Sequence, residues 1–300
     1  MIPPVWLRKN KKSRMLILVL IVIVTFCSTL FCGCLQNQKG FSIVIIGRDS
    51  TSGTREFFWQ HVMEKEDFSI MLQERNSNGG VYLTVMQTPG AIGYVSLGYV
   101  DNGVKALKIN NITANVSNIL VGKYPIARDL SMFTKGNATG ATKEFIEYIQ
   151  STKGQIVVEE EGFVPLTTSI SYNTSGKHLS GTLSISGSTT VFPIIEKAKD
   201  VFVRLNPDIS ITVSSTGSGA GIIAVAQGTV DIGMSSRDLK TSESNLGLVK
   251  YVIAKDGIAI IVNSENTYVD SLTMEQLKAI YKGEITNWED LDKIIGVVAN

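Results

Sequence analysis

Cysteine and histidine are scarce in this 300-residue chain, and their positions exclude several kinds of site. The three cysteines, Cys27, Cys32 and Cys34, lie in or beside an N-terminal apolar run, and the chain after Cys34 contains none. This excludes a disulfide-held fold and a cysteine-based metal site in the bulk of the chain. The two histidines, His61 and His178, are too few for a His-rich metal site and poorly placed for Ser-His catalysis. The sequence therefore predicts no metal and no cofactor.

An excess of charge of one sign is also absent. The chain has 28 Lys and Arg against 27 Asp and Glu. Five of the basic residues lie before residue 15 in a segment without acids, and removing them leaves 23 basic against 27 acidic residues. A nucleic-acid partner held by a basic surface is therefore excluded, and any bound anion must be held by local geometry.

The N-terminus combines this basic cluster with an uninterrupted apolar run over residues 15–31. The pattern is typical of a secretory signal or of an uncleaved membrane helix with its basic end in the cytoplasm. Gly33 precedes Cys34 in a stretch that resembles the lipobox of prokaryotic lipoproteins, with Phe31 where leucine is preferred. Two alternatives stay open, a lipid on Cys34 or a transmembrane anchor. Residues 1–40 are thus predicted to be a signal or anchor with a spacer, and the protein to lie at the outer face of the cell membrane.

The rest of the chain alternates strand-like and helix-like segments. Residues 42–46 and 258–262 are continuous β-branched runs of the kind found in buried strands. Helical periodicity is present at residues 54–63, 142–149, 194–205 and 274–281. Such alternation predicts an α/β fold. Residues 167–180, rich in Ser, Thr, Asn and Gly, are predicted to be a linker.

Three segments share one design, in which a β-like stretch passes through a Gly, Ser and Thr turn into a helix start. They are residues 45–54, 183–193 and 215–221. Helix N-termini bind anions through unpaired N–H groups, glycine lets a ligand approach the backbone, and hydroxyls add neutral donors. The alternative for each turn is a simple helix cap. No turn has the Walker A pattern or dinucleotide spacing, so a phosphoanion that is held but not turned over fits better than a nucleotide.

Eight segments of the chain resemble one family. They are IGRDSTSGTREFF, AIGYVSLGYV, YPIARDLSMFTKG, FIEYIQSTKGQIVVEEEGFVPL, SISGSTTVFPIIEKAKDVF, VSSTGSGAGIIAVAQGTVDIGMSSRDL, KDGIAIIVNSEN and LTMEQLKAIYKGEITNWEDL. Together they resemble the phosphate-binding protein of the Pst-type ABC transporter over residues 41–166 and 181–292. The resemblance implies a type II periplasmic-binding-protein fold with two α/β lobes and a ligand cleft between them. It also implies inorganic phosphate as ligand, the transmembrane subunits of an ABC permease as partners, and no enzymatic activity.

The order of these segments differs from that of the family. Residues 41–166 resemble the family's C-terminal half and residues 181–300 its N-terminal half, so the chain is similar to a circular permutant joined by residues 167–180. Each lobe is then expected to draw on both halves. A rearranged gene or a fragment of a longer tandem remains the alternative.

The resemblance also implies residue roles. The implied phosphate ligands are Arg48, Ser52, Gly53, Thr54, Ser188, Thr189, Thr190, Val191, Ser218 and Asp231. Asp231 matches the acidic ligand, whose carboxylate would accept the proton of hydrogen phosphate and repel sulfate. Ser50 stands where the family can carry an acid two residues after the arginine.

Two other functions remain possible from the sequence. One is an anion sensor or scaffold that signals lobe closure without transport. The other is a phosphoester hydrolase that uses the same cradle, which needs a nucleophile with a base or with metals.

Overall fold

The computed structural model describes residues 42–173 and 178–291, which belong to one compact unit. The basic N-terminal cluster, the apolar run and Cys34 lie outside the described residues. Within the described part of the chain, no helix has the length and hydrophobicity that a membrane crossing requires.

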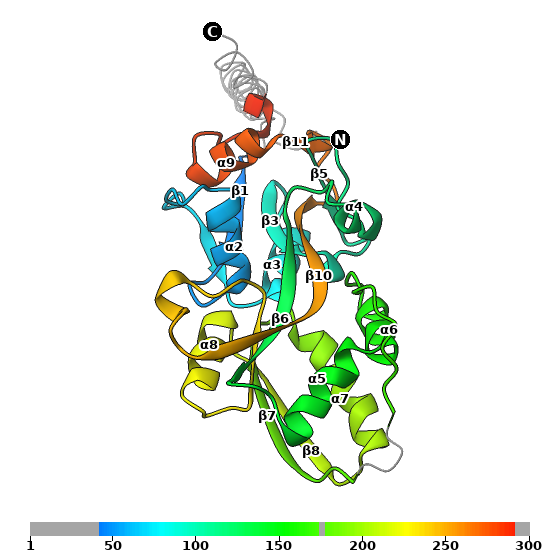
Figure 1. The fold of residues 1–300 in the computed structure, drawn as a ribbon. Helices are drawn as coiled ribbons and strands as arrows, with labels where there is room; N and C mark the ends of the chain where they lie inside the picture. Colours follow the sequence, from blue (N-terminus) through cyan, green and yellow to red (C-terminus); the bar gives the residue numbers. More distant parts are fainter. Residues whose placement is uncertain (1–41, 174–177, 292–300) are drawn as a thin grey trace, which may run out of the picture. The chain divides into compact units, whose positions relative to one another are not determined.

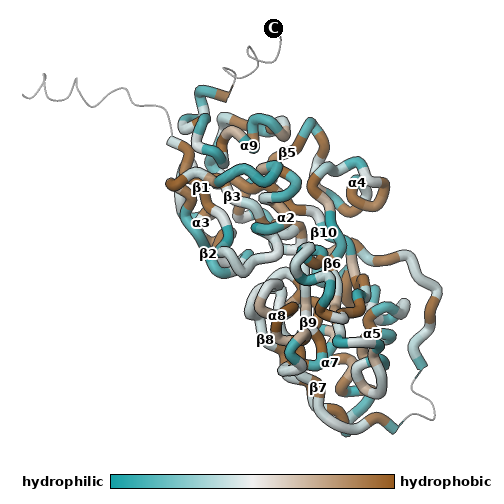
Figure 2. The backbone as a smooth tube through the Cα atoms, turned by 60° about the vertical axis from the view of Figure 1, so that its left-hand side comes forward, coloured by the Kyte–Doolittle hydropathy of each residue, from teal (hydrophilic) through white to brown (hydrophobic). Residues whose placement is uncertain are grey.

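Buried hydrophobic residues form two separate cores. These cores define lobe 1 and lobe 2, which the backbone shows as two bodies (Figure 1; Figure 2). Lobe 1 contains β1 (Val44–Arg48), α2 (Gly53–His61), β2 (Gln73–Arg75), α3 (Asn78–Gln87), β3 (Ala91–Ser96), the 3-10 helix η2 (Leu97–Tyr99), β4 (Val104–Ala106), β5 (Lys108–Ile109), α4 (Val116–Leu120), β11 (Ser271–Leu272) and α9 (Met274–Lys282). Lobe 2 contains α5 (Gly140–Gln150), α6 (Thr152–Glu160), β7 (Gly181–Gly187), α7 (Phe192–Leu205), β8 (Ile209–Ser215), α8 (Ser218–Ala226), β9 (Ile232–Ser235) and the 3-10 helix η3 (Thr241–Glu243). Both lobes therefore contain residues from either side of the segment 167–180.

Two long strands, β6 (Ala127–Lys135) and β10 (Leu248–Asn263), run from one lobe into the other (Figure 1). The main sheet has the strand order β2-β1-β3-β10-β6-β9-β7-β8, with β4 also pairing with β10. β10 pairs antiparallel with β3 in lobe 1 and with β6 along the crossover, and β6 pairs with β9 in lobe 2. These two strands are the hinge through which the lobes are joined.

The described elements agree with the helices and strands that the sequence predicts. Helix α9 begins with a capping box between Thr273 and Gln276 and ends at Gly283, whose φ of 80° is left-handed. The apolar run 258–262 is the buried C-terminal part of a much longer strand, β10, whose first five residues are half-buried or exposed. The α/β class is confirmed.

The segment 167–180 forms no helix or strand where it is described, but part of it packs on lobe 2. The Tyr172 ring is buried 5.3 Å from that of Tyr148 and 5.9 Å from that of Phe202, measured between centroids. The backbone N–H of Thr152 donates to the carbonyl of Ile170 at 2.8 Å. The prediction of a linker with few apolar anchors overlooked Tyr172, which the aromatic residues of α5 and α7 bury.

The first described residues lie next to the last ones. Ser42 forms an antiparallel bridge with Asn287, and the backbone N–H of Ile43 donates to the carbonyl of Thr286 at 2.8 Å. The segment that leads into β1 is therefore held against the segment that follows α9.

Candidate anion-binding site

All three turns singled out from the sequence connect a strand to a helix. The first joins β1 to α2 in lobe 1, and the other two join β7 to α7 and β8 to α8 in lobe 2. Each helix N-terminus leaves backbone N–H groups without partners inside its own helix, and these groups carry a partial positive charge. Three such helix starts, from three separate parts of the chain, are available to one site.

The turns of the two lobes touch each other. The backbone N–H of Gly219, at the start of α8, donates to the carbonyl of Thr51 at 3.1 Å. A β-carbon on Gly53 would overlap the Ser218 hydroxyl and would lie 2.7 Å from the hydroxyl oxygen of Ser236. Position 53 therefore requires glycine in this arrangement, because the backbone of α2 lies directly against lobe 2.

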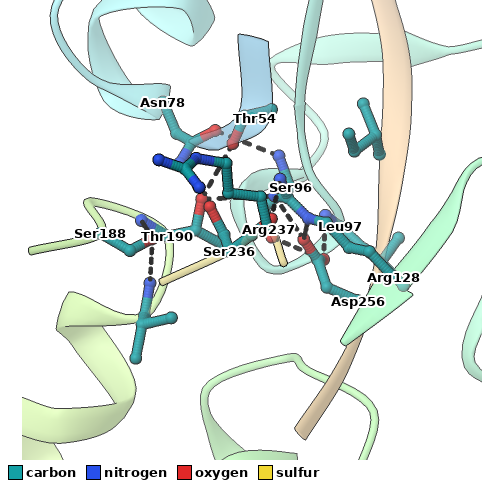
Figure 3. A network of polar contacts seen from close by, with 12 residues as sticks. Thr54, Asn78, Ser96, Leu97, Arg128, Ser188, Thr190, Ser236, Arg237 and Asp256 are labelled. Carbon is teal, nitrogen blue, oxygen red and sulfur yellow. Dashed lines mark hydrogen bonds and ion pairs between the residues drawn. The ribbon is translucent and has the colours of Figure 1, made fainter. Parts of the chain in front are cut away.

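Thr190 is the centre of the contacts between the lobes (Figure 3). Its Oγ1 lies 3.2 Å from Oγ1 of Thr54 and accepts a hydrogen bond from Nδ2 of Asn78 at 2.9 Å. Nη2 of Arg128 lies 3.4 Å from the same oxygen. One hydroxyl of lobe 2 thus meets a hydroxyl, an amide and a guanidinium that come from α2, α3 and the hinge strand β6.

A second pair of hydroxyls lies beside this centre. Oγ of Ser218 lies 3.3 Å from Oγ of Ser236 and accepts from the backbone N–H of Ser236 at 3.1 Å. Both serines are buried. Ser236 directly follows β9, and the sequence analysis missed it.

Arg48 is almost fully buried, with 1% of its surface exposed. Nε donates to the carbonyl of Arg75 at 3.2 Å and Nη2 to that of Asn76 at 3.0 Å, whereas Nη1 has no hydrogen-bond partner among the described residues. Burial lowers the pKa of Arg48, Asp49 opposes this change, and the positive charge of Arg128 adds to it. Arg48 therefore keeps one unpartnered buried donor at the end of β1, directly before the first of the three turns.

The remaining sequence-predicted residues lie in the same turns. The Ser52 hydroxyl caps α2 by accepting from the backbone N–H of Arg55 at 3.2 Å. The Ser188 hydroxyl accepts from the backbone N–H groups of Thr190 and Val191 at 3.2 and 3.3 Å. The carbonyl of Thr189 accepts from the Tyr99 hydroxyl of lobe 1 at 2.9 Å. The same turns therefore cap their helices and lie where the two lobes meet.

Asp231 is the exception, and its assignment as the acidic ligand is corrected by the structure. It is exposed and lies before β9, where its Oδ2 accepts from the backbone N–H and the hydroxyl of Ser184 at 2.8 and 2.7 Å. Ser236, at the other end of β9, is five positions away, or about 16 Å along an extended strand. The carboxylate of Asp231 therefore stabilises the edge of β7 and β9 and does not reach the cluster.

A different carboxylate lies in the cluster. Asp256, on β10, is fully buried and accepts from Nε and Nη2 of Arg128 at 3.0 and 2.8 Å. Its other oxygen accepts from the hydroxyl of Ser96 at 2.7 Å and from the backbone N–H of Leu97 at 3.2 Å. Within the described residues, no group of His, Cys, Asp and Glu could hold a metal ion.

Sequence reasoning missed Asn78, Ser96, Arg128, Ser236 and Asp256. Arg128 and Asp256 lie within strands, inside segments that resemble the family, but outside any glycine-rich turn. A buried charge requires a partner, but each of these strands carries three charged residues, so the sequence alone does not single out Arg128 and Asp256.

The comparison with family models places this fold in a known superfamily. A model described as a PBP superfamily domain matches residues 35–153 and 173–300. The two lobes, the two crossover strands and the polar cluster between the lobes are those of a type II periplasmic-binding-protein fold.

Individual relatives narrow this class. The phosphate-binding protein PstS 2 of Streptococcus agalactiae is 39% identical over 268 residues, covering 86% of this chain and 90% of that protein. PstS 2 of Streptococcus pneumoniae is 36% identical over 264 residues, covering 85% and 89%. A crystal structure of a phosphate-binding protein of a phosphate ABC transporter from Streptococcus pneumoniae matches with a TM-score of 0.69 and 35% identity, over 83% of this chain and 99% of that one. The chain belongs to the family of the PstS phosphate-binding proteins.

Proposed function

We propose that this protein is an extracytoplasmic solute-binding protein that captures inorganic phosphate for uptake by an ABC transporter. The observation that carries the proposal is the convergence of three helix starts and four buried hydroxyls where the lobes meet, with the buried and unpartnered Nη1 of Arg48 directly before the first of these turns. The hydroxyls are those of Thr54, Thr190, Ser218 and Ser236. The relatives named above are binding proteins and not enzymes, which supports a function in capture without turnover.

The chemistry of the cluster suits a tetrahedral oxyanion. A hydroxyl and a backbone N–H can each donate to an anion oxygen at little desolvation cost, because neither carries a full charge. A hydroxyl that now contacts another hydroxyl can exchange that contact for one to the ligand. The proposed ligands are Arg48, Ser52, Gly53, Thr54, Ser188, Thr189, Thr190, Val191 and Ser218, to which we add Ser236.

Calorimetric titration of the full chain in detergent with phosphate, sulfate and a phosphomonoester tests this proposal. We expect phosphate to bind most tightly. The phosphomonoester should bind weakly and stay unhydrolysed, because the organic group on one of its four oxygens prevents that oxygen from being enclosed by the site. Absence of phosphate binding, or release of phosphate from the ester, would overturn the proposal.

The membrane tether and the transporter partner belong to the same proposal. Residues 1–40 would export and anchor the chain, with a lipid on Cys34, and the permease subunits would receive phosphate from the tethered protein. Incorporation of a labelled fatty acid in expressing cells tests the lipid. We expect Cys34→Ser to abolish the label, whereas a labelled Cys34→Ser protein or an unlabelled wild type would exclude the lipid on this residue.

We also propose that the chain is a circular permutant within its family. One observation supports this proposal: Ser42 pairs with Asn287, so the segment before β1 lies against the segment after α9. A permutation requires that the segments to be joined or cut lie side by side. A re-permuted chain that starts at Ser180 and joins residue 291 to Ser42 through a short linker should fold and bind phosphate with unchanged affinity. A re-permuted chain that does not fold, while the present order does, would argue against the proposal.

A further inference from the structure

A buried ion pair lies at the point where the chain crosses between the lobes. Arg128 on β6 and Asp256 on β10 are directly opposite each other in the antiparallel pairing of these strands. Their side chains are 1% and 0% exposed, and Nη2 of Arg128 lies 2.8 Å from Oδ2 of Asp256. The core of lobe 1 includes Ile126 and Ile258, and the core of lobe 2 starts at Leu130 and Ala254. We call Arg128 and Asp256 the hinge pair.

The two members of the hinge pair reach toward different lobes. Asp256 is fixed to lobe 1, because its Oδ1 accepts from the Ser96 hydroxyl and the Leu97 backbone. Arg128 reaches lobe 2, where Nη1 donates to the carbonyl of Ser236 at 3.0 Å and Nη2 contacts Oγ1 of Thr190 at 3.4 Å (Figure 3). The guanidinium thus contacts two residues of lobe 2 that carry proposed anion ligands.

The contact with Thr190 is the longest that the guanidinium makes in this network, and it joins a cation to a neutral oxygen. A cation donates more strongly to an anionic oxygen than to a hydroxyl. An anion held by the hydroxyls of Thr54 and Thr190 would therefore draw one N–H of Arg128 away from Thr190. Asp256 would remain bound to the other edge of the same guanidinium.

We propose that Arg128 is a second cationic ligand of the captured anion, and that Asp256 is a positioning residue that orients Arg128 and balances its charge when no anion is bound. This inference rests on the proposed function. It adds to Arg48, on lobe 1, a cation on the hinge. The anion then contacts Arg48 on lobe 1, Arg128 on the hinge and the hydroxyls of lobe 2. Its binding therefore favours the closed arrangement of the two lobes.

Charge balance gives the hinge pair a signature that a purely structural ion pair lacks. Removing the cation leaves a buried carboxylate beside the site, which repels an anion. Removing the carboxylate leaves a buried cation whose charge only the anion would then balance within the cluster. The two single substitutions should therefore change phosphate affinity in opposite directions, although both should destabilise the protein without ligand.

The experiment measures phosphate affinity by calorimetry, and thermal stability with and without phosphate, for Arg128→Gln, Asp256→Asn and the double variant. We expect Arg128→Gln to weaken phosphate binding about 100-fold or more. We expect Asp256→Asn to lower the melting temperature without phosphate but to bind phosphate about tenfold more tightly. The double variant buries two neutral amides, and we expect its affinity to lie between those of Arg128→Gln and the wild type.

The neighbouring rung of the same strands provides a matched control. Lys255 and Asp129 are paired across β10 and β6 at 3.0 Å, but the two side chains are 45% and 35% exposed. Lys255→Gln removes a hinge cation without touching the cluster and should leave phosphate affinity within about twofold of the wild type.

Each outcome decides one question. A wild-type protein that does not bind phosphate would overturn the proposed function. A wild type that binds phosphate, with Asp256→Asn and Arg128→Gln both equal to it or both weaker, would overturn the role of the hinge pair alone. If Arg128→Gln does not fold, the double variant decides, because wild-type affinity in it would exclude Arg128 as a ligand.

Discussion

The two lobes bring different chemistry to the site where they meet. Lobe 1 contributes the charged Arg48 together with Asn78 and Thr54. Lobe 2 contributes the hydroxyls of Thr190 and Ser218, and its buried Arg237 is already paired with Glu243 of the same lobe at 2.7 Å (Figure 3). A charge attracts an anion over several ångströms, but a hydroxyl acts only in direct contact. If the proposed site binds an anion, we expect lobe 1 to attract it first and lobe 2 to enclose it.

The lobes also differ in how they are held to each other. Their contacts across the site are short and polar, such as the hydrogen bond from Gly219 to Thr51 and the ion pair of Lys240 with Glu56 at 2.9 Å. Neither core extends across the site, since the two hydrophobic clusters are separate. Because the two hydrophobic cores are separate, an anion that contacts both lobes can shift the equilibrium between separated and closed lobes.

The largest loss of anion affinity is expected when the charge of Arg48 in lobe 1 is removed. We expect Arg48→Ala to weaken phosphate binding about 100-fold or more. Sulfate binding should weaken by a similar factor, because the positive charge of Arg48 attracts both anions. Titration with both anions measures this. Arg204→Ala, which removes an exposed arginine at the end of α7, is the control and should change neither affinity. A loss confined to phosphate would contradict the assignment of Arg48 as a general anion ligand.

Preventing contact between the lobes should have a smaller effect. The methyl group in Gly53→Ala would overlap the Ser218 hydroxyl, so we expect phosphate affinity to fall about tenfold to a hundredfold, with lobes that stay farther apart by X-ray scattering. Gly79→Ala is the matched control, because its β-carbon would meet nothing within 4 Å. Unchanged affinity in Gly53→Ala would mean that phosphate binds without the contact between α2 and lobe 2.

Removing one hydroxyl of lobe 2 should reduce phosphate affinity by a smaller factor than either of these changes. Thr190→Val keeps the shape of the side chain but leaves Nδ2 of Asn78 without its acceptor, and we expect phosphate affinity to fall about tenfold. Thr182→Val, on the exposed start of β7, is the control. A loss as large as that of Arg48→Ala would show that a hydroxyl of lobe 2 contributes as much as the charge of lobe 1.

Local patterns in the sequence predicted the turns but not the full site. The β1–α2, β7–α7 and β8–α8 turns carry glycine and hydroxyl residues in a few consecutive positions, so their design is visible in each segment alone. Arg128 and Asp256 are 128 positions apart, and only the antiparallel register of β6 and β10 makes them partners. No periodicity or turn signal contains that information.

The error at Asp231 has a physical reason of the same kind. Asp231 was matched to the acidic ligand of the family, but the structure places it just before the strand β9, and the end of β9 that faces the cluster could not be chosen from the sequence. Because β9 is parallel to β7, its C-terminal end lies beside the β7–α7 turn. The residue after the strand, Ser236, therefore reaches the site, and the residue before it does not.

The smallest expected effect is that of Asp231→Asn. Its carboxylate is exposed and bound to Ser184 at the far end of β9, so the substitution should leave the ratio of phosphate to sulfate affinity within about twofold of the wild type. Competition of the two anions at fixed pH and salt measures this ratio. Asp256→Asn serves as the comparison, since that carboxylate is buried in the cluster and its loss should tighten binding of both anions. A tenfold change of the ratio in Asp231→Asn alone would place its carboxylate at the ligand and contradict the position of β9. An unchanged ratio would mean that the preference between phosphate and sulfate is set by residues of the cluster and not by Asp231.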